Sequence, residues 1–474
     1  MRNSLALFLT ILLFPSPVAQ AKETAQPQPQ SLVFTHATVL DMTGASAKSD
    51  ITVVIAGGRI TAIGKSNRIR LPKNAQIVDA TGKYLIPGLW DMHVHIFNHI
   101  SKAGTNNKDI YFPLMIANGV TGVRDMWTDP DDLKLVRQWQ PDIDAGEMLG
   151  PRIAPGSSIV DGVPTFLPNT LGVSTPGEAR RAVKMLKDAG AGFIKVYWNL
   201  SPEAYYAIAD EAKKLGIAFA GHVPFSVSAA DASNAGQKSI EHLTGILETC
   251  STKAAEFQKA REWTPALAKE MWRTYNDQKC RALFARFAKN GTWHTPTIAL
   301  HRMLAFRREE DFKRDARLRY VPADTAQAWL KPAREGEVVD PETRRVRFKK
   351  LLEAVGMMHR AGVPLLAGTD LGNPFIFAGF SLHDELELFV QAGLTPLEAL
   401  KTATVNPAKY LGMSDSLGTI EKGKIADLVV LEANPLESIS NTQKIAAVVA
   451  NGRYLPKETL MKMLADVEAY VNRR

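Results

Sequence analysis

Hydrophobic and polar positions follow two different rhythms along this chain, and each rhythm predicts its own class of element. Short runs of β-branched residues separated by glycine turns occupy residues 32–78, and similar runs return over residues 426–450 before the Asn451-Gly452 turn. Such runs between turn residues are typical of strands and hairpins. Because isolated short strands need partners, we expect both ends of the chain to meet in one small β-sandwich.

Between these ends, short apolar strands alternate with helical segments, which is the pattern of a parallel α/β structure. Helix periodicity over residues 176–189 and 202–215 follows a Thr or Ser that precedes Pro, a usual helix start. Eight strand–helix units predict a distorted (β/α)8 barrel, the TIM barrel, with an open doubly wound sheet as the alternative. No G-x-G-x-x-G sequence follows the first strand, which disfavours the alternative. The eight predicted strands cover residues 89–96, 120–125, 152–159, 193–197, 218–223, 239–243, 291–297 and 364–370.

The composition is that of a globular protein with a large core. The chain has 474 residues, of which 45% are hydrophobic and 22% are charged. We therefore predict one barrel with an appended β-domain rather than three consecutive domains. The predicted parts are a signal peptide at 1–21, a disordered polar leader at 22–30, a β-sandwich built from 31–84 and 413–455, a barrel at 85–412 with an insertion near 300–350, and a C-terminal helix at 456–474.

The first 21 residues have the three parts of a cleaved secretory signal peptide. A positive start at Arg2 precedes an apolar run from Leu5 to Phe14, and Ala19-Gln20-Ala21 supplies a small-x-small cleavage pattern. A buried N-terminal helix is the alternative. This run is too short to cross a bilayer as a helix, and no later stretch approaches the roughly 20 apolar residues needed. We expect a periplasmic or secreted protein without a membrane span.

The two cysteines of the chain bear on the same question of compartment. In an oxidising compartment, Cys250 and Cys280 can pair as a disulfide. The sequence does not show that their Cβ atoms meet, so two buried free thiols are an equal alternative.

The net charge of +8 raises the question of an anionic partner. Most of the excess lies in one segment, residues 302–350, which contains fourteen Lys and Arg against nine Asp and Glu. Both signs are interleaved there, as on a solvated helix, and the aromatic spacing of a single-strand binding surface is missing. We therefore expect no nucleic-acid partner. The insertion is expected either as a solvated helical excursion or as a lid with cationic groups for a carboxylate substrate, and homo-oligomer formation is left open.

Candidate chemistry begins in the first predicted barrel strand. Residues two apart in a strand share a face, so His93 and His95 of D-M-H-V-H lie on one side, about 7 Å apart. Such a pair alone also occurs as two ordinary hydrogen-bonded histidines. The interpretation is strengthened because other predicted strands also end in groups that bind metals, and barrel enzymes gather such groups at the C-terminal ends of their strands. These further groups are Lys195, His222, His242 and Asp370.

Lys195 is the most informative of these residues. It lies inside the apolar strand F-I-K-V-Y, where burial of an ammonium is unfavourable. The side chain must therefore reach water, lose its proton through a lowered pKa, or be chemically modified. A neutral amine beside two metal ions can add carbon dioxide and become a carbamate that bridges them.

The chain resembles the amidohydrolase superfamily and, within it, the prolidase/imidazolonepropionase-like branch of metal-dependent hydrolases. The motifs that carry the resemblance occur in the expected order, namely P-G-L-W-D-M-H-V-H, F-I-K-V-Y, G-H-V, E-H-L, A-G-T-D, N-P-A-K-Y-L-G and G-x-I-x-x-G-K-x-A-D-L-V-V. The resemblance implies a distorted barrel, a β-sandwich from both termini, and two divalent ions, usually zinc. It also implies the ligand sets. His93, His95, Asp370 and Lys195, the last as N6-carboxylysine, hold the more buried ion, and Lys195, His222 and His242 hold the other.

Two divalent ions that share a water lower its pKa towards 7 and supply a hydroxide at neutral pH. Asp370 then serves as the general acid–base, taking the proton and returning it to the leaving amine. Histidine and carboxylate ligands suit zinc, and manganese or cobalt also fit. We expect hydrolysis of a C–N amide bond in a small substrate, either a Xaa-Pro-type dipeptide or an N-acyl amino acid. The alternatives are a cyclic amide, as in imidazolonepropionase, a xenobiotic amide or ester, and a metal-free barrel without catalysis.

Four further residues are candidates for substrate binding. Tyr197 shares the face of Lys195 and is placed to hydrogen-bond the substrate carbonyl. His294 ends the seventh predicted strand, and Arg124 in V-R-D and His99 in the first loop are candidates for a substrate carboxylate. Ordinary packing or a structural hydrogen bond is the competing interpretation for each of them.

Overall fold

The computed structural model describes residues 31–44, 46–97, 107–129, 132–259, 264–307, 310–331 and 340–473. The predicted signal peptide, the predicted leader and the candidate residue His99 lie outside the described residues. None of the described helices is both long enough and apolar enough to span a bilayer.

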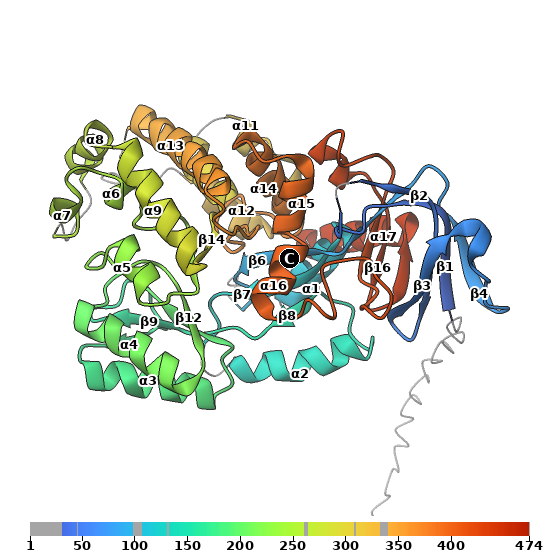
Figure 1. The fold of residues 1–474 in the computed structure, drawn as a ribbon, viewed down its shortest axis with the longest axis horizontal. Helices are drawn as coiled ribbons and strands as arrows, with labels where there is room; N and C mark the ends of the chain where they lie inside the picture. The colour runs from blue at the N-terminus through green and yellow to red at the C-terminus, as the bar shows by residue number, and fades with distance from the viewer. Residues whose placement is uncertain are drawn as a thin grey trace, which may run out of the picture.

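Strands from both ends of the chain form one mixed sheet of eight strands, in the order β17-β16-β15-β5-β1-β2-β3, with β4 pairing to β1. The two ends meet where β5 and β15 pair antiparallel, with Leu85 opposite Val430. Figure 1 shows the blue N-terminal strands beside the red β16 and α17. The strands are β1 (Ser31–Val39), β2 (Lys48–Ala56), β3 (Arg59–Lys65), β4 (Ala75–Asp79), β5 (Tyr84–Pro87), β15 (Leu428–Leu431), β16 (Ile445–Ala450) and β17 (Arg453–Pro456).

The predicted meeting of the two termini is therefore present, but as one sheet rather than as two facing sheets of a sandwich. Apolar side chains from both ends share a single core there, including Phe34, Val53, Leu85, Val430 and Val449. Since neither end alone supplies this core, the N-terminal strands depend on the C-terminal ones for burial of their apolar face.

The body of the chain contains two parallel sheets, as the alternation of strands and helices predicted. One has the order β6-β7-β8 and the other β10-β9-β11-β12-β13-β14, and every pairing in both is parallel. The strands are β6 (Leu89–Val94), β7 (Val120–Asp125), β8 (Arg152–Ala154), β9 (Ile159–Gly162), β10 (Leu171–Val173), β11 (Phe193–Val196), β12 (Ala218–Gly221), β13 (Ser239–Glu241) and β14 (Trp293–Thr295). Seven of the eight predicted barrel strands thus contain regular strand structure.

The eighth predicted strand, residues 364–370, forms no regular strand in the described structure. Its backbone nevertheless joins the two sheets. His294 N donates to Pro364 O, and Leu366 N donates to His294 O at 2.8 Å. On the other side Met92 N donates to Ala367 O at 2.9 Å. The regular strands therefore form two sheets linked by an irregular segment instead of one continuous eight-stranded barrel.

Helices cover the outside of the parallel sheets. The predicted helix starts are present, because Thr175 forms a capping box with Glu178 at α3 and the Ser201 hydroxyl accepts from Ala204 N at α4. The helices are α1 (Asn107–Ala117), α2 (Leu133–Asp144), α3 (Pro176–Asp188), α4 (Pro202–Leu215), α5 (Ala229–Asn234), α6 (Ile246–Thr249), α7 (Ala254–Phe257), α8 (Pro265–Arg273), α9 (Asp277–Asn290), α10 (Ile298–Phe306), α11 (Glu310–Lys313), α12 (Ala323–Leu330), α13 (Pro341–Arg360), α14 (Phe380–Gln391), α15 (Pro396–Thr402), α16 (Val405–Leu411) and α17 (Lys457–Asn472), with short 3-10 helices η1 (Ser66–Arg68), η2 (Ala316–Tyr320) and η3 (Ile439–Gln443).

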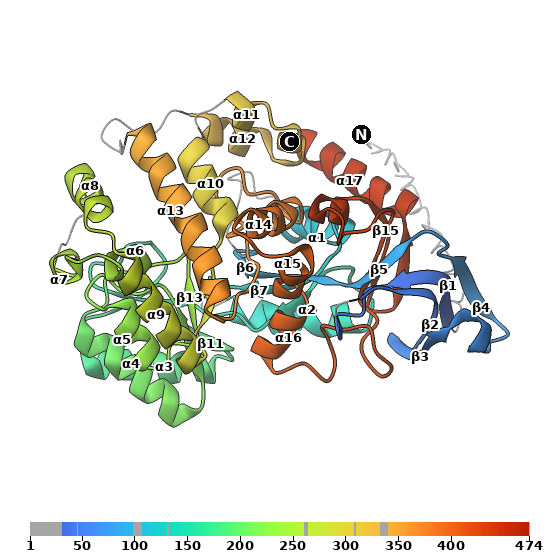
Figure 2. The ribbon, with the colours of Figure 1, turned by 45° about the horizontal axis from the view of Figure 1, so that its top comes forward.

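The basic insertion is helical and is attached to the body by ion pairs. It contains α10 to α13, and α10 and α13 pack side by side (Figure 2). Arg302 and Arg317 both pair with Asp384 on α14, at 3.2 and 2.7 Å. Glu385 accepts hydrogen bonds from Ile298 N and Ala299 N, the first residues of α10. Part of the positive excess of this segment is therefore neutralised within the fold.

The structure pairs Cys250 with Cys280 in a disulfide between the end of α6 and α9. Both cysteines are fully buried. Of the two alternatives that the sequence left open, the structure thus has the disulfide rather than two free thiols.

We expect replacement of both cysteines by serine to lower the free energy of unfolding by about 3 kcal/mol, because the bond closes a loop with a sequence separation of 30 residues in the unfolded chain. Denaturant titration of the wild type and of the Cys250→Ser/Cys280→Ser variant, each with and without reductant, measures this. Reductant should destabilise the wild type and leave the variant unchanged. Equal sensitivity of the two proteins to reductant would contradict the assignment.

Glu385 makes the stability of the insertion depend on pH. Burial raises the pKa of this carboxyl to about 8, although two backbone N–H groups donate to it. Its ordinary value is 4.5, so the folded protein holds the proton more tightly than the unfolded chain does. The resulting stabilisation is complete below pH 4.5 and is lost as pH rises through 8, by at most about 1.4 kcal/mol per pH unit.

We therefore expect the stability of the wild type to fall, relative to Glu385→Gln, as pH rises from 5 to 8. Unfolding free energies measured at several pH values across this window test the slope rather than the absolute difference, since glutamine also loses one acceptor oxygen. Parallel curves for the two proteins would show that Glu385 titrates in its ordinary range.

Candidate metal centre

Ends of different strands bring the predicted metal-binding residues together. His93 lies in β6 and Lys195 in β11, while His222 directly follows β12 and His242 directly follows β13. Asp370 comes from the irregular segment between the two parallel sheets. The residues of this group that line a cavity of about 500 Å³ are His95, Lys195, His222, His242 and Asp370. Convergence at the carboxyl ends of parallel strands, which the sequence predicted, is therefore observed.

Asp370 is at the centre of the group. Its Oδ1 lies 2.8 Å from His95 Nε2 and 3.2 Å from His93 Nε2, and its Oδ2 lies 3.9 Å from His242 Nδ1. The ring centroids of His222 and His242 are 4.7 Å apart. Ligand atoms of His93, His242 and Asp370 all lie within 4.8 Å of one another, a spacing that one metal ion can bridge.

Glu241 fixes the orientation of His93 through the ring nitrogen that faces away from Asp370. His93 Nδ1 lies 2.9 Å from Glu241 Oε2. Burial would raise the pKa of Glu241, but the Arg124 guanidinium and the hydrogen bond from His93 hold it well below its usual range. An ionised carboxylate can only accept, so His93 Nδ1 carries the proton and Nε2 presents a lone pair to the centre. Carboxylate partners of this kind are usual for histidines that bind metals.

The imidazoles are in the protonation state that a metal requires. Burial, together with neighbouring positive groups, lowers the pKa of His93 and of His222 well below the ordinary value. Burial also lowers the pKa of His242 to about 4. All three are therefore neutral at pH 7, as metal ligands must be.

Several of these nitrogens lack any other partner. Three buried ring nitrogens of this group make no hydrogen bond to the described residues, namely His93 Nε2, His95 Nδ1 and His222 Nδ1. Unpaired lone pairs beside an ionised carboxylate are unfavourable unless a cation or a donor is added. The residues present thus fit a divalent metal such as zinc.

Lys195 is 1% exposed and points into the same cavity. Burial lowers its pKa to about 8, although the charges of Glu241 and Asp370 oppose this. Its Nζ makes no hydrogen bond or ion pair to the part of the chain that the structure describes. A substantial fraction of the neutral amine is therefore available near neutral pH, as the sequence argument required for this position.

The backbone around the centre is strained. His242, Thr297 and Asp370 all have left-handed conformations, with φ of 59°, 50° and 64°. Such conformations persist only where surrounding contacts enforce them, and they cluster at functional sites. Asp91 enforces the one at Asp370, because it accepts hydrogen bonds from Thr369 N at 3.0 Å and from Thr369 Oγ1 at 2.6 Å.

Two glycines of the sequence motifs permit the close approach of strands at this site. A Cβ on Gly221, which precedes His222, would meet Val196 O at 2.3 Å and Lys195 Cδ at 3.1 Å. A Cβ on Gly368 would meet Thr295 Cγ2 at 2.5 Å and the His93 backbone nitrogen at 2.9 Å. Larger residues at either position would push apart the strands that carry the ligands.

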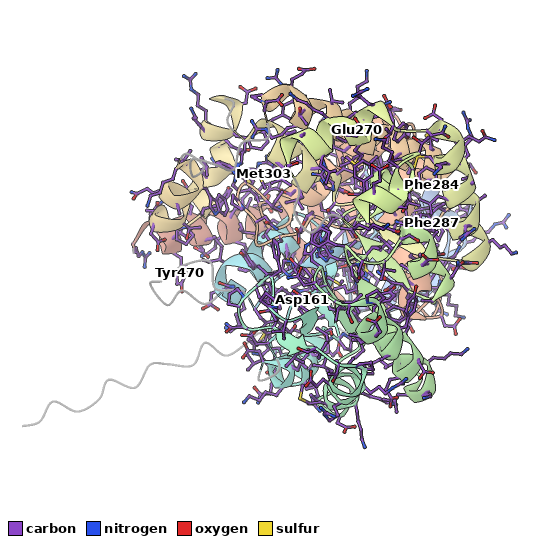
Figure 3. All side chains as sticks on the ribbon, turned by 90° about the vertical axis from the view of Figure 1, so that its left-hand side faces the viewer. Asp161, Glu270, Phe284, Phe287, Met303 and Tyr470 are labelled. Atoms are coloured by element: carbon purple, nitrogen blue, oxygen red, sulfur yellow. A yellow bond between two sulfur atoms is a disulfide. The ribbon has the colours of Figure 1, made fainter. Side chains whose placement is uncertain are left out.

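The rest of the cavity wall is largely apolar and aromatic, with a few polar groups. Asp161, labelled in Figure 3, orders one side of it by accepting from Phe166 N and Asn199 N, both at 2.7–2.8 Å. Asn373 Nδ2 donates to Asp370 Oδ2 at 2.8 Å on another side. The lining residues beyond the metal group include Trp127, Phe166, Tyr197, Trp198, Leu300, His301, Leu304, Arg347 and Asn373.

Of the predicted substrate residues, Tyr197 lies at the cavity. Its ring centroid is 4.2 Å from that of His222. Burial raises the pKa of its phenol, so the hydroxyl stays protonated and can donate. Tyr197 and Lys195 line the same cavity, as expected for two residues on one face of the strand.

His294 is placed elsewhere. It is 0% exposed, does not line the cavity, and packs 4.5 Å from Phe287 of α9, which Figure 3 labels beside Phe284. The physical reason is strand alternation. The neighbouring Thr295 accepts from Arg124 in the interior, so His294 faces the helix layer instead. Of the two interpretations of His294, substrate contact and ordinary packing, the structure has the packing.

Arg124 is also not available to substrate. It is 1% exposed, and its guanidinium donates to Met92 O, Ser239 Oγ, the Tyr410 hydroxyl and both oxygens of Glu241 at 2.7–3.1 Å, besides Thr295. Every N–H group of its side chain is thus occupied. The structure assigns Arg124 to the support of Glu241 rather than to a substrate carboxylate.

Three important residues were given no role from the sequence. Glu241 stands next to a predicted ligand in an apolar strand, and a buried carboxylate there implies a partner, which was a usable signal. His301 donates from Nε2 to the His242 carbonyl at 3.0 Å. His301 and Arg347 belong to the insertion, for which the sequence left a solvated excursion and a cationic lid open without singling out either residue.

Comparison with known proteins agrees with the fold. A sequence profile of the amidohydrolase family matches residues 84–455. Since this match covers well over half of the chain, the chain belongs to the amidohydrolase family. The family is generally metal-dependent, in accord with the His/Asp cluster described above.

Individual relatives support the resemblance to the prolidase/imidazolonepropionase-like branch. The ochratoxinase of Aspergillus niger is 40% identical over 93 residues, which are 19% of this chain and 18% of that protein. The imidazolonepropionase of Pseudomonas syringae pv. tomato is 42% identical over 79 residues, 16% of this chain and 20% of that protein. The matched stretches thus span about a fifth of these curated relatives. A solved protein assigned as a prolidase from Bifidobacterium longum is 26% identical, with a TM-score of 0.65 over 93% of this chain and 100% of that one.

Replacement of Arg124 by methionine tests its structural role. Because the Glu241 charge would remain buried without its partner, we expect the variant to lose about 3–5 kcal/mol of unfolding free energy. A matched control is Lys462→Met, which removes an exposed pair with Asp466 and should leave stability unchanged within error. A stable Arg124→Met protein with only a raised KM would instead support substrate binding by Arg124.

Proposed function

We propose that this protein is an exported, metal-dependent hydrolase that cleaves the C–N amide bond of a Xaa-Pro-type dipeptide or of an N-acyl amino acid. The observation that carries the proposal is the convergence of neutral imidazoles with unpaired nitrogens and one ionised carboxylate at a cavity of about 500 Å³. That volume suits a small substrate. Membership of the amidohydrolase family and likeness to the Bifidobacterium longum protein support it.

We assign two divalent ions, preferably zinc, to the centre. His93, His95, Asp370 and Lys195 as a carbamate are assigned to one ion, and Lys195, His222 and His242 to the other. The buried amine with its lowered pKa supports the modification, since only the neutral amine reacts with carbon dioxide. When bound, such ions lower the pKa of a water and polarise a carbonyl group.

The chain's own residues supply the remaining chemistry. Asp370 stays ionised in the folded protein, because the surrounding histidines hold its pKa well below its usual range against the effect of burial. It is therefore able to take a proton and return it to the leaving nitrogen. The protonated Tyr197 hydroxyl is placed at the cavity to donate to the substrate carbonyl oxygen.

A second candidate reaction uses the same centre on another amide. The local similarities to imidazolonepropionase and to ochratoxinase favour, respectively, opening of a cyclic amide and hydrolysis of a xenobiotic amide or ester. A substrate comparison separates these reactions, because all of them require the same metal ligands.

We also propose that residues 85–412 form a distorted (β/α)8 barrel in which residues 364–370 act as the eighth strand, with residues 31–84 and 413–455 as a second unit. The backbone hydrogen bonds of this segment to β14 and β6 support the assignment. Export is proposed from the pattern of residues 1–21, and the disulfide supports it because such bonds persist in oxidising compartments.

Metal content and activity of a Lys195→Ala variant test the proposal. We expect wild-type protein produced with zinc and bicarbonate to hold two ions per chain and to hydrolyse members of a panel of Xaa-Pro dipeptides and N-acyl amino acids. Lys195→Ala should lose at least one ion and most activity, because no standard side chain bridges at that reach. Lys184→Ala, an exposed lysine on α3, is the matched control and should behave as the wild type.

Two results would overturn the assignment. Wild-type protein with well under one ion per chain, measured by elemental analysis, would exclude metal-dependent hydrolysis. Near-normal turnover of Lys195→Ala would exclude the bridging carbamate. Activity confined to cyclic or xenobiotic amides in the same panel would favour the second candidate reaction.

A further inference from the structure

Arg347 is a cation at the wall of the cavity, and the described residues offer it no hydrogen-bond or ion-pair partner. We propose that Arg347 on α13 binds a free carboxylate of the substrate, so that the enzyme selects amides in which an amino acid with an unblocked carboxylate is joined to an apolar group. This inference rests on the proposed function and narrows its substrate class. It is also the role that the sequence argument sought in Arg124 and His99.

The first observation is the absence of any ion pair. Arg347 is exposed and lines the cavity, and it makes no hydrogen bond or ion pair to the described residues. Other arginines of the same insertion are paired, since Arg302 and Arg317 both contact Asp384. The cavity contains Asp370 as its one lining carboxylate in the described part of the chain. The guanidinium is thus available to an anion that enters from outside.

The second observation concerns the surroundings of the guanidinium. The protein around it removes enough water to lower the pKa of Arg347, and the charge of Glu248 opposes this change without forming an ion pair. A partly desolvated cation without a counter-ion gains more from an incoming carboxylate than a fully hydrated one. The planar guanidinium can make two parallel hydrogen bonds to that carboxylate.

The third observation is that packing and hydrogen bonds connect the helix of Arg347 to the candidate metal centre. Its helix α13 packs on α10, and α10 is held at its first turn by Glu385. From α10, His301 donates to the His242 carbonyl at 3.0 Å. His301 acts here as a positioning residue, since it ties the insertion to the strand end that carries His242.

The size and lining of the cavity define the rest of the substrate. A cavity of about 500 Å³ is roughly 8 Å across, close to the about 7 Å that two extended residues span. Trp127, Phe166, Leu300 and Leu304 supply apolar wall between the charged groups. An amide held with its carbonyl at the metal centre and its carboxylate on Arg347 fills this space, whereas a neutral cyclic amide leaves the guanidinium unpaired.

A matched pair of substrates tests this assignment. N-acetyl-L-phenylalanine and its C-terminal carboxamide differ only in the charge that Arg347 would contact. We expect the zinc-loaded wild type to prefer the acid. Arg347→Met should lower kcat/KM for the acid roughly 10- to 100-fold, mainly through KM, because one charge-assisted contact is removed. The carboxamide should change by less than about threefold.

Two further variants make the result specific. Arg347→Lys keeps the charge without the planar fork and should recover part of the lost KM effect. Lys349→Met removes an exposed charge from the same helix and should leave both substrates unaffected. Equal losses for acid and carboxamide in Arg347→Met, or no loss for the acid, would overturn the proposal.

Calorimetric binding of the same two compounds to each protein separates this inference from the proposed function. If the wild type hydrolyses neither compound but binds the acid more tightly than the carboxamide, and Arg347→Met abolishes that difference, the carboxylate site stands while the hydrolytic assignment fails. If the wild type binds acid and carboxamide equally, or binds neither, the carboxylate site itself is excluded.

Discussion

The buried ion pair between Arg124 and Glu241 is the interaction on which the candidate metal centre depends. Glu241 carries a charge in the middle of the protein, which is tolerable only because Arg124 neutralises it with two hydrogen bonds of 3.0 Å. That charge makes His93 donate from Nδ1 and present Nε2 to Asp370. The same guanidinium reaches Ser239, Thr295 and the Tyr410 hydroxyl, so β7, β13, β14 and α16 are held around one group. Arg124 and Glu241 thus fix the tautomer of His93 and also hold these strands and this helix together.

The irregular segment between β14 and β6 is explained by the orientation that the Asp370 carboxylate must have. A regular strand would alternate its side chains and would not turn the Asp370 carboxylate back towards His93 of β6 and towards His95, which lies just beyond that strand. The left-handed backbone at Asp370 does so, and the hydrogen bonds from Thr369 to Asp91 hold the strained conformation in place. Regular strand structure is therefore absent around Asp370, where the carboxylate has to point towards the histidines.

The contacts of the basic insertion show what its positive charges do. Its charge is divided between arginines that attach the insertion to Asp384 and one arginine that faces the cavity. Its first helix is fixed by Glu385 and by the contact of His301 with the His242 backbone. Of the two alternatives that the sequence left open, a solvated excursion and a cationic lid, the structure favours a segment at the site, since several of its residues line the cavity.

The sequence by itself determined the parallel α/β class, the meeting of the two termini, and the candidate metal-binding group at the strand ends. Strand runs, Thr-Pro and Ser-Pro helix starts and motif residues are local patterns, and the meeting of the termini follows because isolated short strands need partners. Only the tertiary structure decided which buried polar residues face the cavity. It turned His294 towards α9, placed Arg124 beneath Glu241, paired the two cysteines, and brought Arg347 to the wall. The physical reason is that a buried charge or ring needs a partner, and this partner lies on another strand or helix, often more than a hundred residues away. Local sequence patterns do not identify such a partner.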